Sequence, residues 1–188
     1  MMVCSVGWAE EIRWDDLVSA VIQVESGGNS NAVSSQGAIG LMQITPIVLK
    51  EYMRYYKKDE FIQAFREDSL LRPQVNKDIG TWYLHRLHNH YLKGIAMWDD
   101  RISKTIQVER EPIGWDDRPL YIFIPTKYIK NANDYKIALI LAAYNGGITR
   151  LEKVNYDINK MPKETRDYVK RVISLYQEWE DKWYPRPH

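Results

Sequence analysis

Residues 24–46 read VESGGNSNAVSSQGAIGLMQITP and place one carboxylate, Glu25, at the end of an otherwise apolar helical pattern. Gly27 and Gly28 stop that helix directly after the acid. Apolar surroundings disfavour a charged carboxylate and raise its pKa above the ordinary value of roughly 4.3. A carboxyl with a pKa near neutrality can donate a proton and take it back. Taken by itself, however, the helix end favours the simpler interpretation that Glu25 reaches solvent.

Helical patterns dominate the rest of the chain. The first helix is expected to start at a cap on Asp15 or Asp16 and to run to about Glu25. Residues 29–44 are rich in Asn, Ser and Gly, which predicts a loop with short extended pieces. Further helices are expected from Thr45-Pro46 to about Lys57, from Pro73 along a stripe that reaches Tyr91, from Asp134 to Asn145, over residues 148–154, and from Pro162 to about Trp183.

The composition of these helices predicts where they pack. Gly80 lies inside a helix, where glycine is unfavourable, and this predicts a close contact that a side chain would block. The segment YKIALILAAYN is apolar on nearly all sides, so its helix is expected to be deeply buried. The last helix should bury one stripe, formed by Val169, Val172, Ile173, Tyr176 and Trp179.

Residues 93–133 differ in character from the helical segments around them. RISKTIQVER and PLYIFIPTKY have the β-branched and aromatic residues typical of strands, and EPIGWDDR between them carries turn residues. We expect a β-hairpin inserted between helices. The chain, 1–188, is then predicted to be a single, mainly α domain of the α+β type.

The composition also restricts the classes of function. The formal net charge is +1, which gives no electrostatic case for nucleic acid as a partner. Cys4 is the single cysteine, so an internal disulfide and a Cys/His zinc site are excluded. The four histidines show no convincing metal spacing. No apolar run is long enough for a stable membrane span.

Aromatic residues are unusual in kind, with 7 Trp and 13 Tyr against 3 Phe. Trp and Tyr combine a flat apolar face with a polar tip, so they can stack on sugar rings and line polar grooves. The simpler interpretation, which suits most of them, is that they fill core and surface like other side chains.

Four separated pieces of the chain, in order, resemble the catalytic domain of lytic transglycosylases of the soluble type, within the goose-type lysozyme superfamily. Together they cover residues 14–92 and 134–180. The pieces are Glu25-Ser26-Gly27; Ala32-Val33-Ser34 leading into Gly37-Ala38-Ile39-Gly40-Leu41-Met42-Gln43-Ile44, with Pro46; Pro73, Asn76, Gly80 and Tyr83-Leu84; and Ala142-Ala143-Tyr144-Asn145-Gly146-Gly147 followed by Pro162, Glu164-Thr165-Arg166 and Tyr168-Val169.

The resemblance implies a role for individual residues. Glu25 matches the single catalytic acid/base of the family. The implied substrate-side residues are Ser34 facing the acid, Gln43 in the groove near the sugar, Tyr144 with its hydroxyl beside Glu25, Asn145 as a substrate-side amide, and Glu164 and Tyr168, which close the groove from the last helix. Two of these have simpler explanations: Glu164 as a first-turn helix acid and Asn145 as a turn residue at a helix end.

The resemblance also implies a fold and a reaction. The fold would be lysozyme-like, with a substrate groove between two helical lobes. The substrate would be peptidoglycan, cut between N-acetylmuramic acid (MurNAc) and N-acetylglucosamine (GlcNAc) with formation of a 1,6-anhydro ring. Most glycosidases use two carboxylates, whereas the matching motifs supply one, and no metal or organic cofactor is implied.

The sequence departs from the family pattern in three places. Lys77 stands where an apolar residue is common, and Gly146 replaces a small Ala in the Tyr-Asn motif. The largest departure is the long segment 93–133, which we interpret as a groove wall, a docking surface for an envelope or secretion-complex partner, or a stability patch. These departures bear on glycan length and mode of cutting more than on the chemistry.

Two rival functions remain at this stage. A goose-type lysozyme would hydrolyse the same bond with water and would need a second carboxylate. A silent cell-wall binding or assembly protein would keep the fold without cleavage, which the joint presence of Glu25, Gln43 and Tyr144 argues against. A wall-directed enzyme belongs in the periplasm or cell envelope, yet the start, MMVCSVGWAEE, lacks a full export signal and is either a remnant of one or a frayed terminus.

Overall fold

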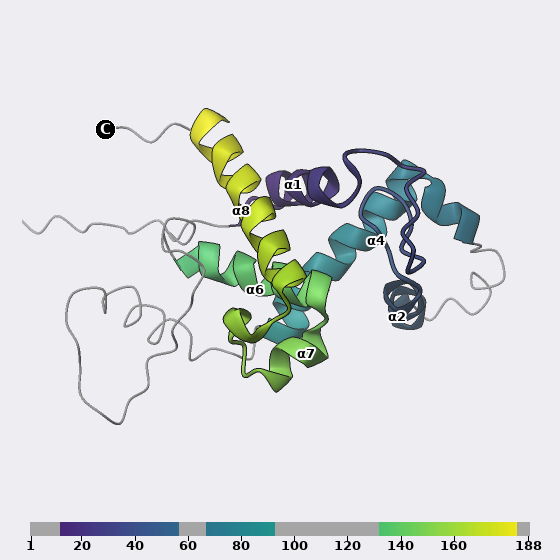
Figure 1. Ribbon diagram of the computed structural model, residues 1–188. Coiled ribbons are helices and arrows are strands. Elements are labelled where there is room, and N and C mark those ends of the chain that lie inside the picture. The colour runs from purple at the N-terminus through teal and green to yellow at the C-terminus, as the bar shows by residue number, and fades with distance from the viewer. Residues whose placement is uncertain (1–11, 57–66, 93–131, 184–188) are drawn as a thin grey trace, which may run out of the picture.

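The computed structural model describes residues 12–56, 67–92 and 132–183, and these residues form a mainly helical structure (Figure 1). The predicted fold class is therefore confirmed in its helical part. The hairpin predicted for 93–133 lies outside the described residues, except for its last two positions, which begin a helix.

The elements are α1 (Trp14–Ser26), α2 (Pro46–Tyr56), the 3-10 helix η1 (Glu67–Leu71), α4 (Pro73–Arg86), the π-helical turn η2 (Leu87–Leu92), α6 (Ala132–Gly146), α7 (Ile148–Lys153), the short 3-10 helix η5 (Ile158–Lys160) and α8 (Lys163–Trp183).

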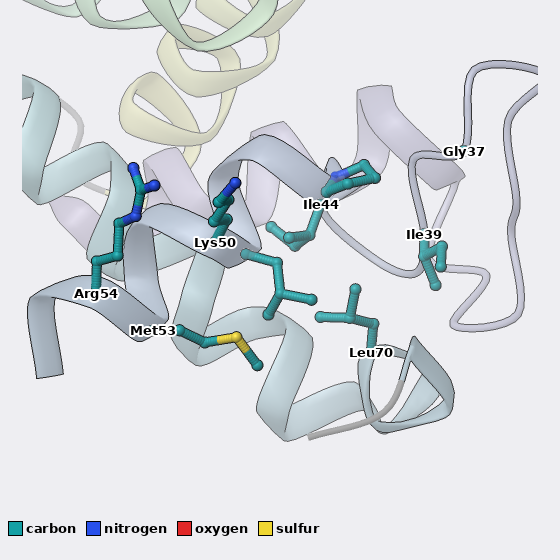
Figure 2. A pocket seen from close by; sticks show the side chains of 9 residues that line it. Gly37, Ile39, Ile44, Lys50, Met53, Arg54 and Leu70 are labelled. Atoms are coloured by element: carbon teal, nitrogen blue, oxygen red, sulfur yellow. The ribbon is translucent and has the colours of Figure 1, made fainter. Parts of the chain in front are cut away.

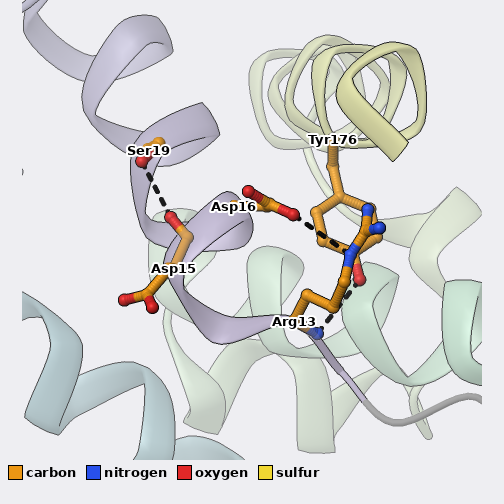
Figure 3. A network of polar contacts seen from close by, with 5 residues as sticks. All are labelled: Arg13, Asp15, Asp16, Ser19 and Tyr176. Carbon is orange, nitrogen blue, oxygen red and sulfur yellow. Dashed lines mark hydrogen bonds and ion pairs between the residues drawn. The ribbon is translucent and has the colours of Figure 1, made fainter. Parts of the chain in front are cut away.

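The start of α1 differs from the prediction that an aspartate caps it. Arg13 is the N-cap residue, in extended conformation, and Asp15 and Asp16 lie within the first turn. The reason is tertiary: the Arg13 backbone N–H donates to the Tyr176 hydroxyl of α8 at 3.2 Å, which fixes where the chain enters the helix (Figure 3). The two aspartates still favour the helix, because acids in the first turn complement the helix dipole. Asp16 also forms an ion pair with the Arg13 guanidinium at 3.0 Å.

The end of α1 is built as the glycines predict. Gly27 adopts the left-handed conformation with a φ of 61° and donates its N–H to the Gln23 carbonyl at 3.2 Å. The Ser26 hydroxyl then donates to the Leu41 carbonyl at 2.8 Å, which holds the following loop against the helix end. Within that loop, single β-bridges join Val33 to Ile39 and Ile39 to Ile44, so the predicted loop with short extended pieces is confirmed.

A fully buried amide, Asn76 of α4, fastens this loop to the helical body. Its Oδ1 accepts from the Met42 N–H at 2.8 Å. Its Nδ2 donates to the carbonyls of Ile39, at 2.7 Å, and Leu70, at 2.9 Å. Gly40 has a φ of 80° and passes so close that an added Cβ would lie 2.2 Å from this Nδ2. Three chain segments therefore depend on one side chain.

Gly80 makes the close contact that its helical position predicts. A Cβ built on Gly80 would lie 2.4 Å from the sulfur of Met42, whose side chain is fully buried. The loop that follows α1 therefore presses its Met42 side chain onto the α4 backbone. This contact and the Asn76 amide act on the same stretch of loop, one through packing and the other through hydrogen bonds.

The core is centred on α6, as its apolar composition predicts. Helix α8 packs against both α6 and α1, and it crosses α6 in Figure 1. Residues 137–143 are all buried, and the α8 stripe from Val169 to Tyr176 is buried with Trp179 packed against it. In the described part of the chain, no helix is long and apolar enough to cross a membrane.

Replacing Asn76 with alanine should lower the free energy of unfolding by roughly 2–4 kcal/mol, because three hydrogen bonds are lost and buried groups lose their partner. Urea denaturation followed by circular dichroism measures this. Asp78→Asn is the matched control, since it changes an exposed polar residue of the same helix and should stay within about 0.5 kcal/mol of the wild type. A loss below about 1 kcal/mol for Asn76→Ala would contradict the fastening role.

Candidate active site

Glu25 lies in the last turn of α1, half-buried, and its pKa is raised to about 7. Burial of the carboxyl is the largest cause, because a charged carboxylate loses solvation there. The Tyr168 side chain and the Arg171 charge act in the opposite direction and lower the pKa, while the Glu164 charge raises it. At neutral pH the carboxyl is therefore poised between its acid and base forms.

One face of α8 supplies all three groups that act on Glu25. Glu164, Tyr168 and Arg171 follow one another at intervals of four and three residues, which places them on the same side of the helix. Helices α1 and α8 pack against each other. The acid at the end of α1 is thus influenced by a negative, a neutral and a positive group that all lie on one face of the neighbouring helix α8.

Tyr168 is the most deeply buried of these groups, with 2% of its surface exposed. Its hydroxyl interacts with the Glu25 carboxyl, and burial and the nearby carboxylate raise the pKa of Tyr168 well above its usual range. The two groups nevertheless fall short of a hydrogen bond with ordinary distance and angle, and the hydroxyl has no other partner among the described residues. A neutral, buried O–H next to the acid can donate to the carboxylate once the carboxyl has lost its proton.

Tyr144 connects the acid to the loop. Its hydroxyl, near the end of α6, donates to the Met42 carbonyl at 2.8 Å. Burial, followed by the Glu25 charge, raises the pKa of Tyr144 well above its usual range. Its ring packs against the Tyr83 ring of α4, with centroids 5.6 Å apart. Tyr144 is therefore a neutral hydroxyl near Glu25, held by the same loop residue that Asn76 fixes.

Gln43 and Ser34 use their side chains to shape the loop. Gln43 has a φ of 48°, unusual for a residue other than glycine, and its Nε2 donates to the carbonyls of Gly40, at 3.0 Å, and Ala32, at 3.2 Å. The Ser34 hydroxyl accepts from the Ala38 N–H at 2.9 Å. A strained, doubly anchored Gln43 is typical of a functional site. The contact of either residue with a sugar stays a prediction.

Asn145 and Glu164 lie at exposed positions. Asn145 is the second-to-last residue of α6, and Glu164 is in the first turn of α8. Glu164 is near enough to act on the Glu25 charge, so its position is more than that of a helix-start acid. Asn145 is open to solvent, as a substrate-side amide or a turn residue would be.

Three residues of this site received no role from the sequence. Arg171 acts on Glu25 and Tyr168 by charge, Ser26 ties the loop to the helix end, and Tyr83 supports Tyr144. The sequence contained a signal for Arg171, because this residue follows Tyr168 by three positions and so lies on the same helix face. Ser26 and Tyr83 had only their membership of the matching motifs.

The described residues also form a cavity of about 280 Å³ between α2, the loop and η1 (Figure 2). Its walls are mainly apolar, and the Lys50 and Arg54 side chains rise from α2 on one side of it. Its lining includes neither Glu25 nor any other predicted site residue. In the described ranges, no group of three or more His, Cys, Asp or Glu residues could hold a metal ion.

Comparison with known proteins shows the family of the chain. Residues 7–166 match the model of the transglycosylase SLT domain, and the chain belongs to that family. The membrane-bound lytic murein transglycosylase E of Buchnera aphidicola is 42% identical over 85% of this chain and 68% of the relative. The endo-type membrane-bound lytic murein transglycosylase A of Cronobacter sakazakii is 42% identical over 42% of this chain and 38% of that relative.

A solved structure shares the fold. The 70 kDa soluble lytic transglycosylase of Escherichia coli matches 90% of this chain with a TM-score of 0.53 and 22% identity. The match covers 22% of that larger chain, so the similarity concerns one part of it. The lysozyme-like fold expected from the sequence is thereby confirmed.

The pKa of Glu25 should shift in opposite directions when the two charges on α8 are removed. Arg171→Gln should raise it, because a positive neighbour that favours the carboxylate is gone, and Glu164→Gln should lower it. Titration of the side-chain carboxyl by carbon-13 NMR measures both without any substrate. Glu178→Gln, an exposed acid further along α8, is the control and should leave the pKa unchanged. Shifts of the same sign for the two variants would show that this electrostatic picture is wrong.

Proposed function

We propose that this chain is a peptidoglycan lytic transglycosylase, which cleaves the MurNAc-β-1,4-GlcNAc bond and leaves 1,6-anhydro-MurNAc ends. The observation that carries the proposal is a single carboxyl, Glu25, whose pKa of about 7 suits it to give and then take one proton. Membership of the SLT family and the murein-cleaving names of the relatives support the substrate.

The first step uses the acid form. Neutral Glu25 donates its proton to the glycosidic oxygen, so that the bond to the leaving GlcNAc breaks. The MurNAc N-acetyl oxygen stabilises the positive charge that develops at C1. The burial that raises the pKa of Glu25 keeps this proton available at neutral pH.

The second step uses the base form. The Glu25 carboxylate removes the proton of the MurNAc C6 hydroxyl, whose oxygen attacks C1 and closes the anhydro ring. The proton that Glu25 gave away is thereby recovered, and no water is consumed. Arg171 and the Tyr168 hydroxyl favour the carboxylate during the interval between the steps. Attack within one molecule gains from high effective molarity, and the proposed reaction uses no cofactor.

The remaining predicted residues are proposed to bind the glycan. Gln43 would present the outer side of its strained loop to the sugar, and Ser34 supports the same loop. Tyr144 would keep the sugar near Glu25, while Asn145 and Glu164 stand at the exposed ends of α6 and α8.

Hydrolysis by a lysozyme-type mechanism is the second candidate, and one observation favours testing it. Hydrolysis needs a second carboxylate that activates water. Glu164 is the candidate, because its charge acts on the Glu25 carboxyl. The products separate the two reactions, because a transglycosylase yields sugars lighter by one water than the reducing sugars of hydrolysis. Loss of hydrolysis in Glu164→Gln would identify this acid as the base.

The place of action follows from the substrate. We propose that the protein works at the cell envelope, in agreement with the membrane-bound names of its relatives, and more specifically in the periplasm. A partner in an envelope or secretion complex would be met through residues 93–133, of which all but the last two lie outside the described ranges.

Glu25→Gln should slow cleavage of purified peptidoglycan by roughly 10²- to 10⁴-fold, because the amide cannot donate the proton. Mass spectrometry of the released muropeptides measures both the rate and the type of product. Glu152→Gln, an exposed acid of α7, is the control. Near-normal cleavage by Glu25→Gln would disprove its role, and reducing ends in the wild-type products would replace the transglycosylase proposal with hydrolysis.

A further inference from the structure

The cavity between α2, the loop after α1 and η1 shares no lining residue with the candidate active site (Figure 2). Its apolar walls include Ile39 and Ile44 of the loop, Leu70 of η1, and Leu49 and Met53 of α2. Two cations of α2 complete the lining, and no acid is among the described residues that form it. The cavity therefore combines an apolar interior with positive charge on one side.

The positive charge comes from Lys50 and Arg54. These residues are four positions apart on α2, which places them on one side of the helix, and Figure 2 shows their nitrogen ends pointing the same way. Both residues are exposed, and within the described part of the chain neither forms an ion pair. A guanidinium and an ammonium without an acidic partner favour a carboxylate, because hydrogen bonds between charged groups are the stronger ones.

The volume of the cavity limits what it can hold. It measures about 280 Å³, whereas an apolar cavity of about 150 Å³ already binds benzene. A ligand of roughly a dozen non-hydrogen atoms therefore fits. A protein partner needs an interface of roughly 1,200–2,000 Å², which a cavity of this size does not supply by itself. A small molecule that is apolar at one end and anionic at the other matches both the walls and the two cations.

We propose that this cavity binds a medium-chain carboxylate such as octanoate. The hydrocarbon chain lies against the apolar walls, and the carboxylate accepts hydrogen bonds from Lys50 and Arg54. Burial of the chain supplies the affinity. The charged group stays beside the exposed cations, which avoids the cost of burying it without a partner. The proposal concerns binding alone, so it does not depend on the proposed function.

The ligand contacts the segments that Asn76 holds together. The Asn76 side chain donates to the carbonyls of Ile39 and Leu70, which both line the cavity, and accepts from the Met42 N–H. A ligand that binds only while these segments are joined stabilises that arrangement. At a ligand concentration of ten times Kd, exchange of the Met42 N–H with solvent should slow about tenfold. The Met42 carbonyl accepts from the Tyr144 hydroxyl, so the cavity borders the network that holds the candidate active site.

NMR titration of the full chain with octanoate, below its critical micelle concentration, measures the binding. We expect saturation of a single site with a Kd of about 0.1–1 mM. Lys50→Gln/Arg54→Gln should weaken octanoate about tenfold and leave the weaker binding of octanol, which has the same chain without the charge, unchanged. Arg150→Gln/Lys153→Gln removes two exposed cations from α7 and is the matched control. Met53→Trp fills the cavity and should abolish binding of both ligands.

Several outcomes would overturn the proposal. One is the absence of saturable octanoate binding, and another is an equal affinity for octanoate in Lys50→Gln/Arg54→Gln and the wild type. Sedimentation with vesicles of anionic phospholipid, without binding of free octanoate, would assign this face to a bilayer surface instead. A dimer of the ligand-free protein that Met53→Trp abolishes would assign the cavity to a second copy of the chain. Unchanged exchange of the Met42 N–H at saturation would disprove the link to the loop.

Discussion

The buried amide of Asn76 is the interaction on which the site depends. It accepts from the Met42 N–H and donates to two carbonyls, so the loop after α1, η1 and α4 meet at one side chain. The Met42 carbonyl in turn accepts a hydrogen bond from the hydroxyl of Tyr144, which lies near Glu25. A fully satisfied buried amide is rigid and specific, because any displacement leaves a polar group unpaired. The position of the acid relative to its loop is therefore fixed by a residue that does not touch it.

The burial of Glu25 is unfavourable for its charged form, and the same burial gives the carboxyl a pKa suited to proton transfer. Burial favours the neutral form of Glu25, and Tyr168 and Arg171 on α8 partly reverse that preference, so both protonation states are within reach near neutral pH. Within the part of the chain that the structure describes, the Tyr168 hydroxyl lies beside Glu25 without a hydrogen bond of ordinary geometry, which belongs to the same compromise. A stability-optimised structure would pair this hydroxyl, whereas a site that cycles between acid and carboxylate needs a donor that is used in one state only.

Much of the fold followed from local patterns, but two features of the site did not. The helices, the glycine stop after Glu25 and the close contact at Gly80 were predicted from periodicity and glycine placement, whose causes are local in the chain. The cap of α1 was wrongly predicted, because Tyr176, far away in sequence, receives the Arg13 N–H and sets the helix start. Arg171 was missed as well, because its influence on Glu25 exists only once α8 packs on α1.

The sequence by itself determined the helical class, the family and the identity of one acid in an apolar setting, because periodicity, glycines and motif order are properties of the chain alone. Only the tertiary structure decided how the acid is tuned and how the loop is held. Charges on α8, the Met42 carbonyl and the Asn76 amide act over distances that are short in space and long in sequence. The same holds for the cavity beside α2, whose walls come from α2, the loop and η1 and meet only after these segments pack.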